Sequence, residues 1–159
     1  MTLRIRSGER SDVPLIAELI RGLARYERLE EEVTMTEARL DRALFGKRPY
    51  AETLIAEDDG KPVGFALFFH NFSTFLAQPG IYLEDLFVLP EHRGGGVGRA
   101  LLAALARLAV ERGCGRLEWA VLDWNRDAIR FYESLGAKPN SDWEVYRLTG
   151  ESLRALAGQ

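Results

Sequence analysis

The glycine-rich segment Arg93–Arg99 constrains the fold most, because it separates an apolar strand-like run from a long helix-like run. The run before it, residues 81–88, is apolar on both faces, as expected of a central strand covered by helices on each side. The run after it keeps helical spacing to about Arg112, with Gly113 as the expected C-cap. These features predict a strand–turn–helix unit within layered α/β structure.

Periodicity and turn residues predict the other elements. We expect strands at residues 3–6, 53–57, 62–69, 116–122 and 144–148, helices at 11–28, 34–45 and 125–135, and a loop at 70–80. The spacing Thr34–Glu37 is that of a capping box and marks the start of the second helix. A hairpin turn at Asp58–Lys61 makes at least one strand pair antiparallel, so we expect a mixed sheet.

Length and composition narrow the functional classes. The 159 residues fit one domain, expected to span residues 1–159. The 21 basic and 24 acidic residues give a net charge of −3, which argues against a nucleic-acid partner. A single cysteine and two histidines exclude a Cys-based zinc site, and we expect no metal. No signal peptide and no apolar run near ~18 residues is present, so we expect a cytoplasmic protein with no membrane partner.

The glycine turn has the composition of an anion site. Four of the five residues 94–98 are glycine, which exposes backbone N–H groups at a helix N-terminus and suits a pyrophosphate. Arg93 and Arg99 can add charge-assisted hydrogen bonds. A plain tight turn is the alternative. A dinucleotide fingerprint fails because Arg99 or Leu101 takes the third glycine position, and no Gly-Lys-Ser/Thr forms a P-loop.

Glu84 and Asp85 interrupt the otherwise apolar central strand. Strand alternation sends the two carboxylates to opposite faces unless a bulge intervenes. In the structural interpretation, each pairs with an arginine or accepts backbone N–H groups. In the chemical one, a carboxylate accepts the proton of an alkylammonium group, whose pKa lies near ~10.4.

Several motifs together resemble one enzyme family. Arg-x-x-Gly-x-Gly at residues 93–98 resembles the acetyl-CoA signature of the GNAT N-acetyltransferase superfamily, and Phe131–Ala137 is similar to a later helix end of that family. The resemblance runs from about residue 3 to 148. Leu23–Glu27, Tyr82–Asp85 and 120–125 resemble its spermidine/spermine (diamine) acetyltransferase branch, and 72–75 leans toward the thialysine-acetylating type. Ser73-Thr74-Phe75 replaces the Asp-Pro-Trp of the polyamine enzymes, which leaves use of polyamines open.

This resemblance implies a fold and a reaction. The fold is a mixed, mostly antiparallel sheet flanked by helices, with central strands that splay apart. The reaction is direct acetyl transfer from acetyl-CoA to a primary amine of a small molecule: a diamine, a polyamine or a thialysine-like amino acid. Glu84 is implied as the proton acceptor and Tyr132 as the acid toward the departing thiolate, although helical spacing alone leaves Tyr132 a core residue. The family also implies a homodimer.

The same resemblance implies two sets of binding residues. The residues expected to bind acetyl-CoA are Leu86, Phe87, Val88, Arg93, Gly94, Gly95, Gly96, Val97, Gly98, Arg99, Asn125, Asp127 and Ala128. The residues expected to bind the amine are Tyr26, Glu27, Glu84, Glu118 and Trp119. The alternatives are acetylation of a protein N-terminus or lysine, another amino acid or an aminoglycoside, and a CoA-binding protein without turnover.

Overall fold

The computed structural model describes residues 1–159, which form two compact units, Met1–Ala120 (unit 1) and Val121–Gln159 (unit 2). The expectation of one domain over the whole chain stays a prediction. The strands of unit 1 are β1 (Leu3–Ser7), β2 (Glu52–Asp58), β3 (Lys61–Ser73), β4 (Gln78–Val88) and β5 (Leu117–Trp119). Its α-helices are α1 (Val13–Tyr26), α2 (Glu37–Phe45) and α3 (Val97–Glu111), and unit 2 contains α4 (Arg126–Ser134) and α5 (Gly150–Ala157).

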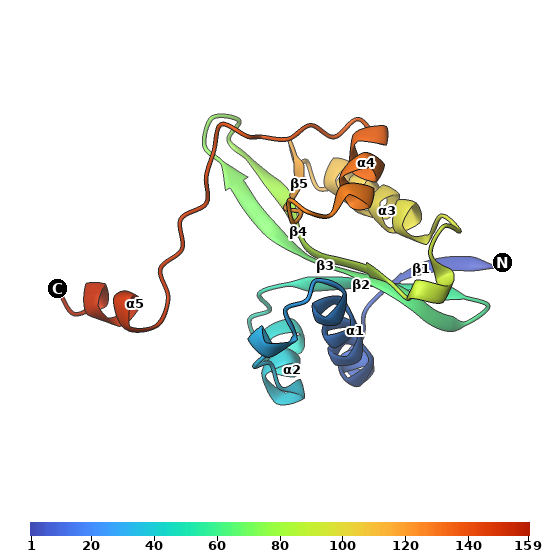
Figure 1. Ribbon diagram of the computed structural model, residues 1–159, viewed down its shortest axis with the longest axis horizontal. Helices are drawn as coiled ribbons and strands as arrows, with labels where there is room; N and C mark the ends of the chain where they lie inside the picture. The colour runs from blue at the N-terminus through green and yellow to red at the C-terminus, as the bar shows by residue number, and fades with distance from the viewer. The chain divides into compact units, whose positions relative to one another are not determined.

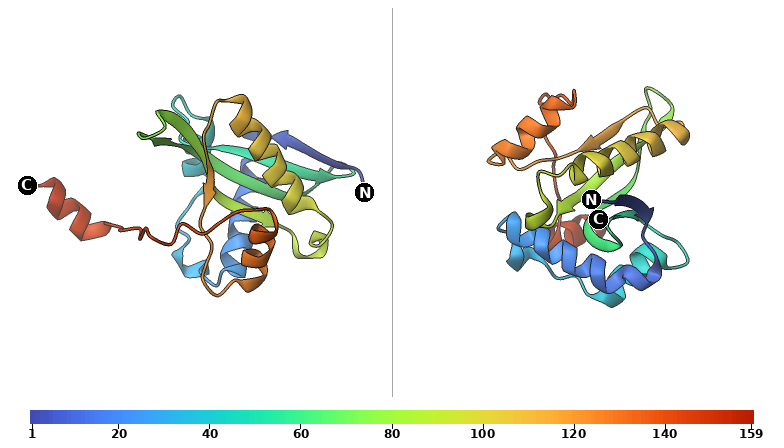
Figure 2. Two further views of the ribbon diagram at one scale, coloured as in Figure 1. Left: turned by 90° about the horizontal axis from the view of Figure 1, so that it is seen from above. Right: turned by 90° about the vertical axis from the view of Figure 1, so that its right-hand side faces the viewer.

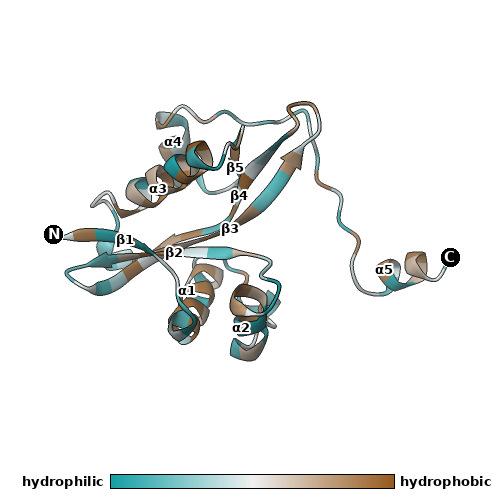
Figure 3. Ribbon diagram, turned by 180° about the vertical axis from the view of Figure 1, so that it is seen from behind, coloured by the Kyte–Doolittle hydropathy of each residue, from teal (hydrophilic) through white to brown (hydrophobic).

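Unit 1 is layered around a single sheet, with α1 and α2 on one face and α3 on the other (Figures 1 and 2). Both α1 and α2 carry apolar and polar residues side by side, as amphipathic helices do (Figure 3). The apolar face of α1 packs Ile16 and Leu19 against Ile55, Phe65 and Phe87 of the strands, and all five side chains are buried. This core fixes α1 on β4, the strand that holds both acids.

The sheet has the order β1-β2-β3-β4-β5, with three antiparallel pairs and a parallel pair between β4 and β5. The expected mixed, mostly antiparallel sheet is therefore confirmed. β5 pairs with β4 only from Ile81 to Leu83. From Glu84 to Val88, β4 has no strand neighbour on that side, which confirms that the central strands splay apart.

The prediction of a long loop over 70–80 was wrong, because β3 continues to Ser73 and β4 begins at Gln78. Polar residues that are poor strand formers find distant partners here. His70 Nδ1 lies 3.0 Å from the Gly80 carbonyl oxygen, and Asn71 Nδ2 donates to Glu118 Oε1 at 3.2 Å. A local pattern contains no information about such partners, so the predicted strand 62–69 ended before the observed end of β3 at Ser73.

The prediction of a last strand at 144–148 was also wrong, since those residues adopt no regular structure and α5 follows them. The apolar alternation there lacks a strand to pair with, and backbone pairing is what makes such a pattern a strand. β5 is shorter than its expected range of 116–122 for a related reason: beyond Trp119 it has no partner on β4.

Thr36, rather than the expected Thr34, caps α2. The Thr36 side chain accepts a hydrogen bond from the Arg39 backbone N–H at 3.2 Å, and its backbone is extended, as an N-cap requires. Two threonines with the same chemistry stand two positions apart, so local spacing placed the helix start two residues early.

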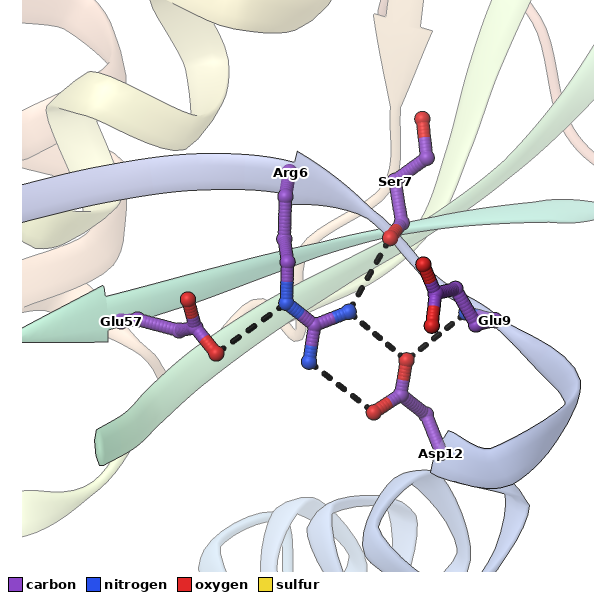
Figure 4. Close-up of polar contacts among 5 residues, drawn as sticks. All are labelled: Arg6, Ser7, Glu9, Asp12 and Glu57. Atoms are coloured by element: carbon purple, nitrogen blue, oxygen red, sulfur yellow. Dashed lines mark hydrogen bonds and ion pairs between the residues drawn. The ribbon is translucent and has the colours of Figure 1, made fainter. Parts of the chain in front are cut away.

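A polar network around Arg6 joins β1, β2 and the start of α1 (Figure 4). The Arg6 guanidinium donates to both Asp12 carboxylate oxygens at 2.8 and 3.0 Å and to Glu57 at 3.1 Å. Asp12 Oδ2 also accepts the Glu9 backbone N–H at 2.7 Å. The arginine holds the pKa of Asp12 below its usual value, so the pair stabilises unit 1 above that range and weakens in acid.

Candidate active site

A β-bulge at Glu84 shapes the middle of β4. Phe68 of β3 pairs with Leu83, and the preceding residue Leu67 pairs with Asp85, so Glu84 has no partner on β3. Because one extra residue reverses the alternation of side chains, Asp85 moves to the face of Leu67 and Phe87, which α1 covers. The sequence predicted Glu84 and Asp85 on opposite faces of β4 unless a bulge intervened. The bulge is present, and the two carboxylates interact.

Three carboxylates interact at this place in unit 1. Burial, followed by the charges of Glu84 and Glu27, raises the pKa of Asp85 to about 7. Burial and the charge of Glu84 also raise the pKa of Glu27, which follows the last residue of α1. The surroundings therefore favour a cation, because a positive charge would relieve the mutual repulsion.

The same cluster explains which acid is accessible. Glu84 is exposed, whereas Asp85 is partly buried and Glu27 is partly exposed. Burial, Glu84 and Glu118 raise the pKa of the nearby Tyr82 hydroxyl. Three of the residues expected to contact the amine are therefore connected electrostatically. Glu27 interacts with Glu84, and both Glu84 and Glu118 act on the Tyr82 hydroxyl.

The other two expected amine contacts take different positions. Tyr26, at the end of α1, is 38% exposed and its ring lies beside Arg93. Trp119 pairs with Leu83 at the last position of the β4–β5 ladder, one residue before the bulge. Glu118 accepts the hydrogen bond from Asn71, which orients its carboxylate.

The glycine turn keeps its backbone open. Gly94 and Gly96 have φ values of +80° and +88°, a region that side-chain-bearing residues rarely adopt, and a Cβ at either would meet no atom within 4 Å. Gly96 is the N-cap of α3 and provides no side-chain acceptor, so the first-turn N–H groups of Val97, Gly98 and Arg99 have no cap. The residues present therefore fit a phosphate group.

The edge of β4 leads from the acids to this turn. Leu86, Phe87 and Val88 pair with β3 on one side and have no strand on the other. An extended chain can hydrogen-bond along such an edge. The Phe87 side chain itself belongs to the core, so only its backbone is available to a ligand in this way.

Unit 2 carries the remaining expected residues on or beside α4. Asn125 is the N-cap, and its side chain accepts the Ala128 backbone N–H at 3.4 Å. Asp127 forms an ion pair with Arg130 on the same helix. Tyr132 is partly buried, and its ring centroid lies 5.6 Å from that of Phe131.

Sequence reasoning undervalued two residues. Asp85 was given a structural interpretation as readily as a chemical one, yet its raised pKa is the reverse of what an arginine partner would produce. Asn71, which holds Glu118, was assigned to a loop. Two successive acids in an apolar strand were the available signal for Asp85, and only the bulge explains how the two carboxylates come to interact.

No group of three or more His, Cys, Asp or Glu side chains in residues 1–159 is arranged to hold a metal ion. No helix of the structure is both long enough and apolar enough to cross a bilayer.

Comparisons with known proteins identify the family of the chain. The model of the acetyltransferase (GNAT) family matches residues 16–137. The chain is 39% identical to thialysine N-epsilon-acetyltransferase of Bos taurus, covering 98% of the chain and 97% of that protein. It is 34% identical to L-ornithine N5-acetyltransferase NATA1 of Arabidopsis thaliana, covering 98% and 88%.

A solved structure is similar over the whole length. The integron cassette protein VCH_CASS6, from the mobile metagenome of V. cholerae, matches with a TM-score of 0.83 and 29% identity, covering 100% of this chain and 99% of that one. The resemblance to the thialysine type is therefore confirmed by sequence and the sheet architecture by structure. The chain is an acetyltransferase and belongs to the acetyltransferase (GNAT) family.

Proposed function

We propose that this acetyltransferase moves an acetyl group from acetyl-CoA directly to a primary amine of a small molecule. The carboxylates of Glu27, Glu84 and Asp85 beside the open edge of β4 are the observation that carries the proposal. Such an acceptor is a cation at neutral pH, as a diamine, a polyamine or a thialysine-like amino acid is. The names of the two relatives, which specify thialysine Nε and ornithine N5, favour the terminal amine of an amino acid.

Residues of unit 1 bind and orient the donor. The exposed N–H groups of residues 94–99 donate hydrogen bonds to the pyrophosphate, as do Arg93 and Arg99. The backbone of Leu86–Val88 pairs with the extended arm of the donor along the open edge of β4. The family resemblance also assigns Asn125, Asp127 and Ala128 of unit 2 to acetyl-CoA. When bound, acetyl-CoA supplies the thioester that is the acyl donor.

Two side chains move protons. Glu84 is exposed at the bulge and accepts a proton from the substrate ammonium group, which frees the nitrogen lone pair. The new C–N bond forms as the C–S bond breaks, and the Tyr132 hydroxyl donates a proton to the departing sulfur. The acylated nitrogen then releases its second proton, which returns Tyr132 to its neutral form. Neither a lysine nor a cysteine nucleophile takes part, so no acetyl-enzyme forms.

Asp85 and Glu27 retain the cation while Glu84 acts. Both carboxylates lie within electrostatic reach of each other and of Glu84, and burial strengthens their pull on a bound ammonium group. Glu118 and Trp119 of β5 and Tyr26 of α1 complete the amine site in this proposal.

We extend the proposal to a cytoplasmic homodimer. The homodimer is supported by the segment 143–148, where the apolar side chains of Trp143, Val145 and Tyr146 are 77%, 91% and 91% exposed. Apolar side chains gathered at such exposure are typical of a surface that another chain covers.

The decisive experiment measures acetyl-CoA consumption against a panel of acceptors. The panel holds thialysine, ornithine, diamines, spermidine, a peptide with a free N-terminus, and an aminoglycoside. We expect turnover with terminal amines of small cations, and Glu84→Gln lowers it most near neutral pH, where deprotonation is hardest. Turnover only with the peptide or the aminoglycoside would overturn the acceptor, and CoA binding without any turnover would overturn the enzyme. An unchanged pH profile in Glu84→Gln would remove it as the proton acceptor.

A further inference from the structure

A groove of about 720 Å³ runs through unit 1 between α1 and the end of β4. Arg93, the first residue of the glycine turn, lines this groove together with Tyr26, Gly22 and Phe87. The Arg93 side chain thus lies on the side of the turn that α1 covers. The sequence had given Arg93 only a direct contact with phosphate.

The Arg93 guanidinium is held by three contacts. Its central carbon lies 4.6 Å from the centroid of the Tyr26 ring and 5.3 Å from that of Phe87. Its Nε donates to the Val88 carbonyl oxygen at 2.9 Å. Cation–π contacts and a charge-assisted hydrogen bond together restrict a side chain that would otherwise be flexible. The two terminal nitrogens have no protein acceptor and are available to a phosphate.

Gly22 makes this arrangement possible. A Cβ at Gly22 would lie only 2.9 and 3.1 Å from two ring carbons of Phe87, so a larger residue would push α1 away from β4. Gly22 and Tyr26 are four residues apart and share one face of α1. The close approach at Gly22 therefore brings the Tyr26 ring to the guanidinium one turn later.

We infer that Tyr26 is a positioning residue for the donor: through its ring contact with Arg93 it orients the glycine turn, and so it strengthens CoA binding from the amine side of the site. This inference rests on the proposed use of acetyl-CoA. The ring fixes the plane of the guanidinium, which then holds the start of the turn against Val88 and presents its terminal N–H groups. Loss of the Tyr26 ring leaves the guanidinium with only its Phe87 and Val88 contacts, so CoA binding must then supply more of the free energy that orders it.

The test measures the dissociation constant of CoA by calorimetry with no amine present. We expect Tyr26→Leu to weaken CoA binding by about 2- to 30-fold, which is the range of one cation–π contact. Tyr26→Phe keeps the ring and should stay within about 2-fold of the wild type. Unchanged CoA affinity in Tyr26→Leu would overturn the inference. Failure of the wild-type protein to bind CoA would instead overturn the proposed donor, and this inference with it.

A double-mutant cycle separates positioning from a general loss of stability. In an Arg93→Gln background, Tyr26→Leu should have no further effect on CoA affinity, because the contact is already gone. Arg99→Gln is the matched control: it removes a charge from the same turn, yet Arg99 has no ring contact, so Tyr26→Leu should keep its full effect there. A full effect of Tyr26→Leu in the Arg93→Gln background would show that Tyr26 acts by another route and would overturn the inference. Thermal unfolding of each variant confirms that the comparison is between folded proteins.

Discussion

Asp85 is a partly buried carboxyl with two acidic neighbours, and no arginine is positioned to offset them. Its pKa of about 7 means that its charge changes within the physiological range. Since the folded state raises this pKa above the value of 3.8 in an unfolded chain, ionisation of Asp85 costs stability. The penalty is absent below about pH 4, grows as the pH rises toward 7, and is complete above it.

We expect Asp85→Asn to stabilise the protein increasingly as the pH rises. The gain should be near zero at pH 3 and on the order of 4 kcal/mol at pH 8, measured as the free energy of urea unfolding. Asp142→Asn, at an exposed position of unit 2, is the control and should change little at any pH. A constant gain at all pH values would contradict the raised pKa. The same substitution should weaken capture of the amine and so raise its KM.

Tyr132→Phe tests the proton donor, since it removes one oxygen and keeps the ring. We expect kcat to fall by about 100-fold or more, with an unchanged dissociation constant for CoA. Tyr50→Phe, which alters an exposed tyrosine, should leave kcat unchanged. Full activity of Tyr132→Phe, or a burst of acetyl-enzyme in rapid kinetics, would exclude the proposed mechanism.

At the scale of elements, α2 offers a clean comparison between two threonines. Thr36→Ala removes the hydrogen bond to the Arg39 N–H and should lower the free energy of unfolding by about 1 kcal/mol. Thr34→Ala makes the same chemical change outside the helix and should cost well under half as much. Chemical denaturation of both variants measures the difference. Equal costs would place the helix start where the sequence pattern had put it.

Strong periodicity predicted the elements of unit 1 that local residues determine. The helices α1 and α3, the hairpin between β2 and β3, and the glycine turn all lie within a few residues of their expected positions. Their boundaries depend on caps and turn residues within the same segment, so one local window contains the information. The glycine turn was predictable in position for the same reason, and its role in binding the donor stays a prediction.

The features that failed depend on partners far away in sequence. β3 extends because His70 and Asn71 meet residues of β4 and β5, and the segment 144–148 has the pattern of a strand without a neighbour. The sequence analysis named a bulge near Glu84 as a possibility and did not predict it, because nothing in the local sequence distinguishes a bulged strand from a regular one. The Tyr26–Arg93 contact likewise joins two elements that only the packed core brings together.

On the scale of the whole molecule, the net charge of −3 conceals two regions of opposite sign in unit 1. Arg93 and Arg99 flank the glycine turn, whereas Glu27, Glu84 and Asp85 gather near the bulge. In the proposed reaction, an anionic donor and a cationic acceptor are each drawn to a separate region. Salt should weaken both attractions through their exposed charges, Arg99 in one region and Glu84 in the other, because salt screens exposed charges most.

The homodimer is the prediction that belongs to the whole molecule. Replacing Trp143, Val145 and Tyr146 together by Ser should shift the protein from dimer to monomer in sedimentation analysis at micromolar concentration. Val110→Ser removes an apolar side chain that is 80% exposed on α3 and should leave the mass unchanged. A wild-type protein that sediments as a monomer at these concentrations would contradict the dimer.

The length of the open edge of β4 limits which donors can react. Between the bulge at Glu84 and the last strand residue Val88 it offers five residues, or about 16 Å of extended backbone. A donor anchored at the glycine turn can place its reactive end beside the acids only if its arm spans that distance. Thioesters shortened within the arm should therefore be rejected by length alone, even where every contact at either end is preserved.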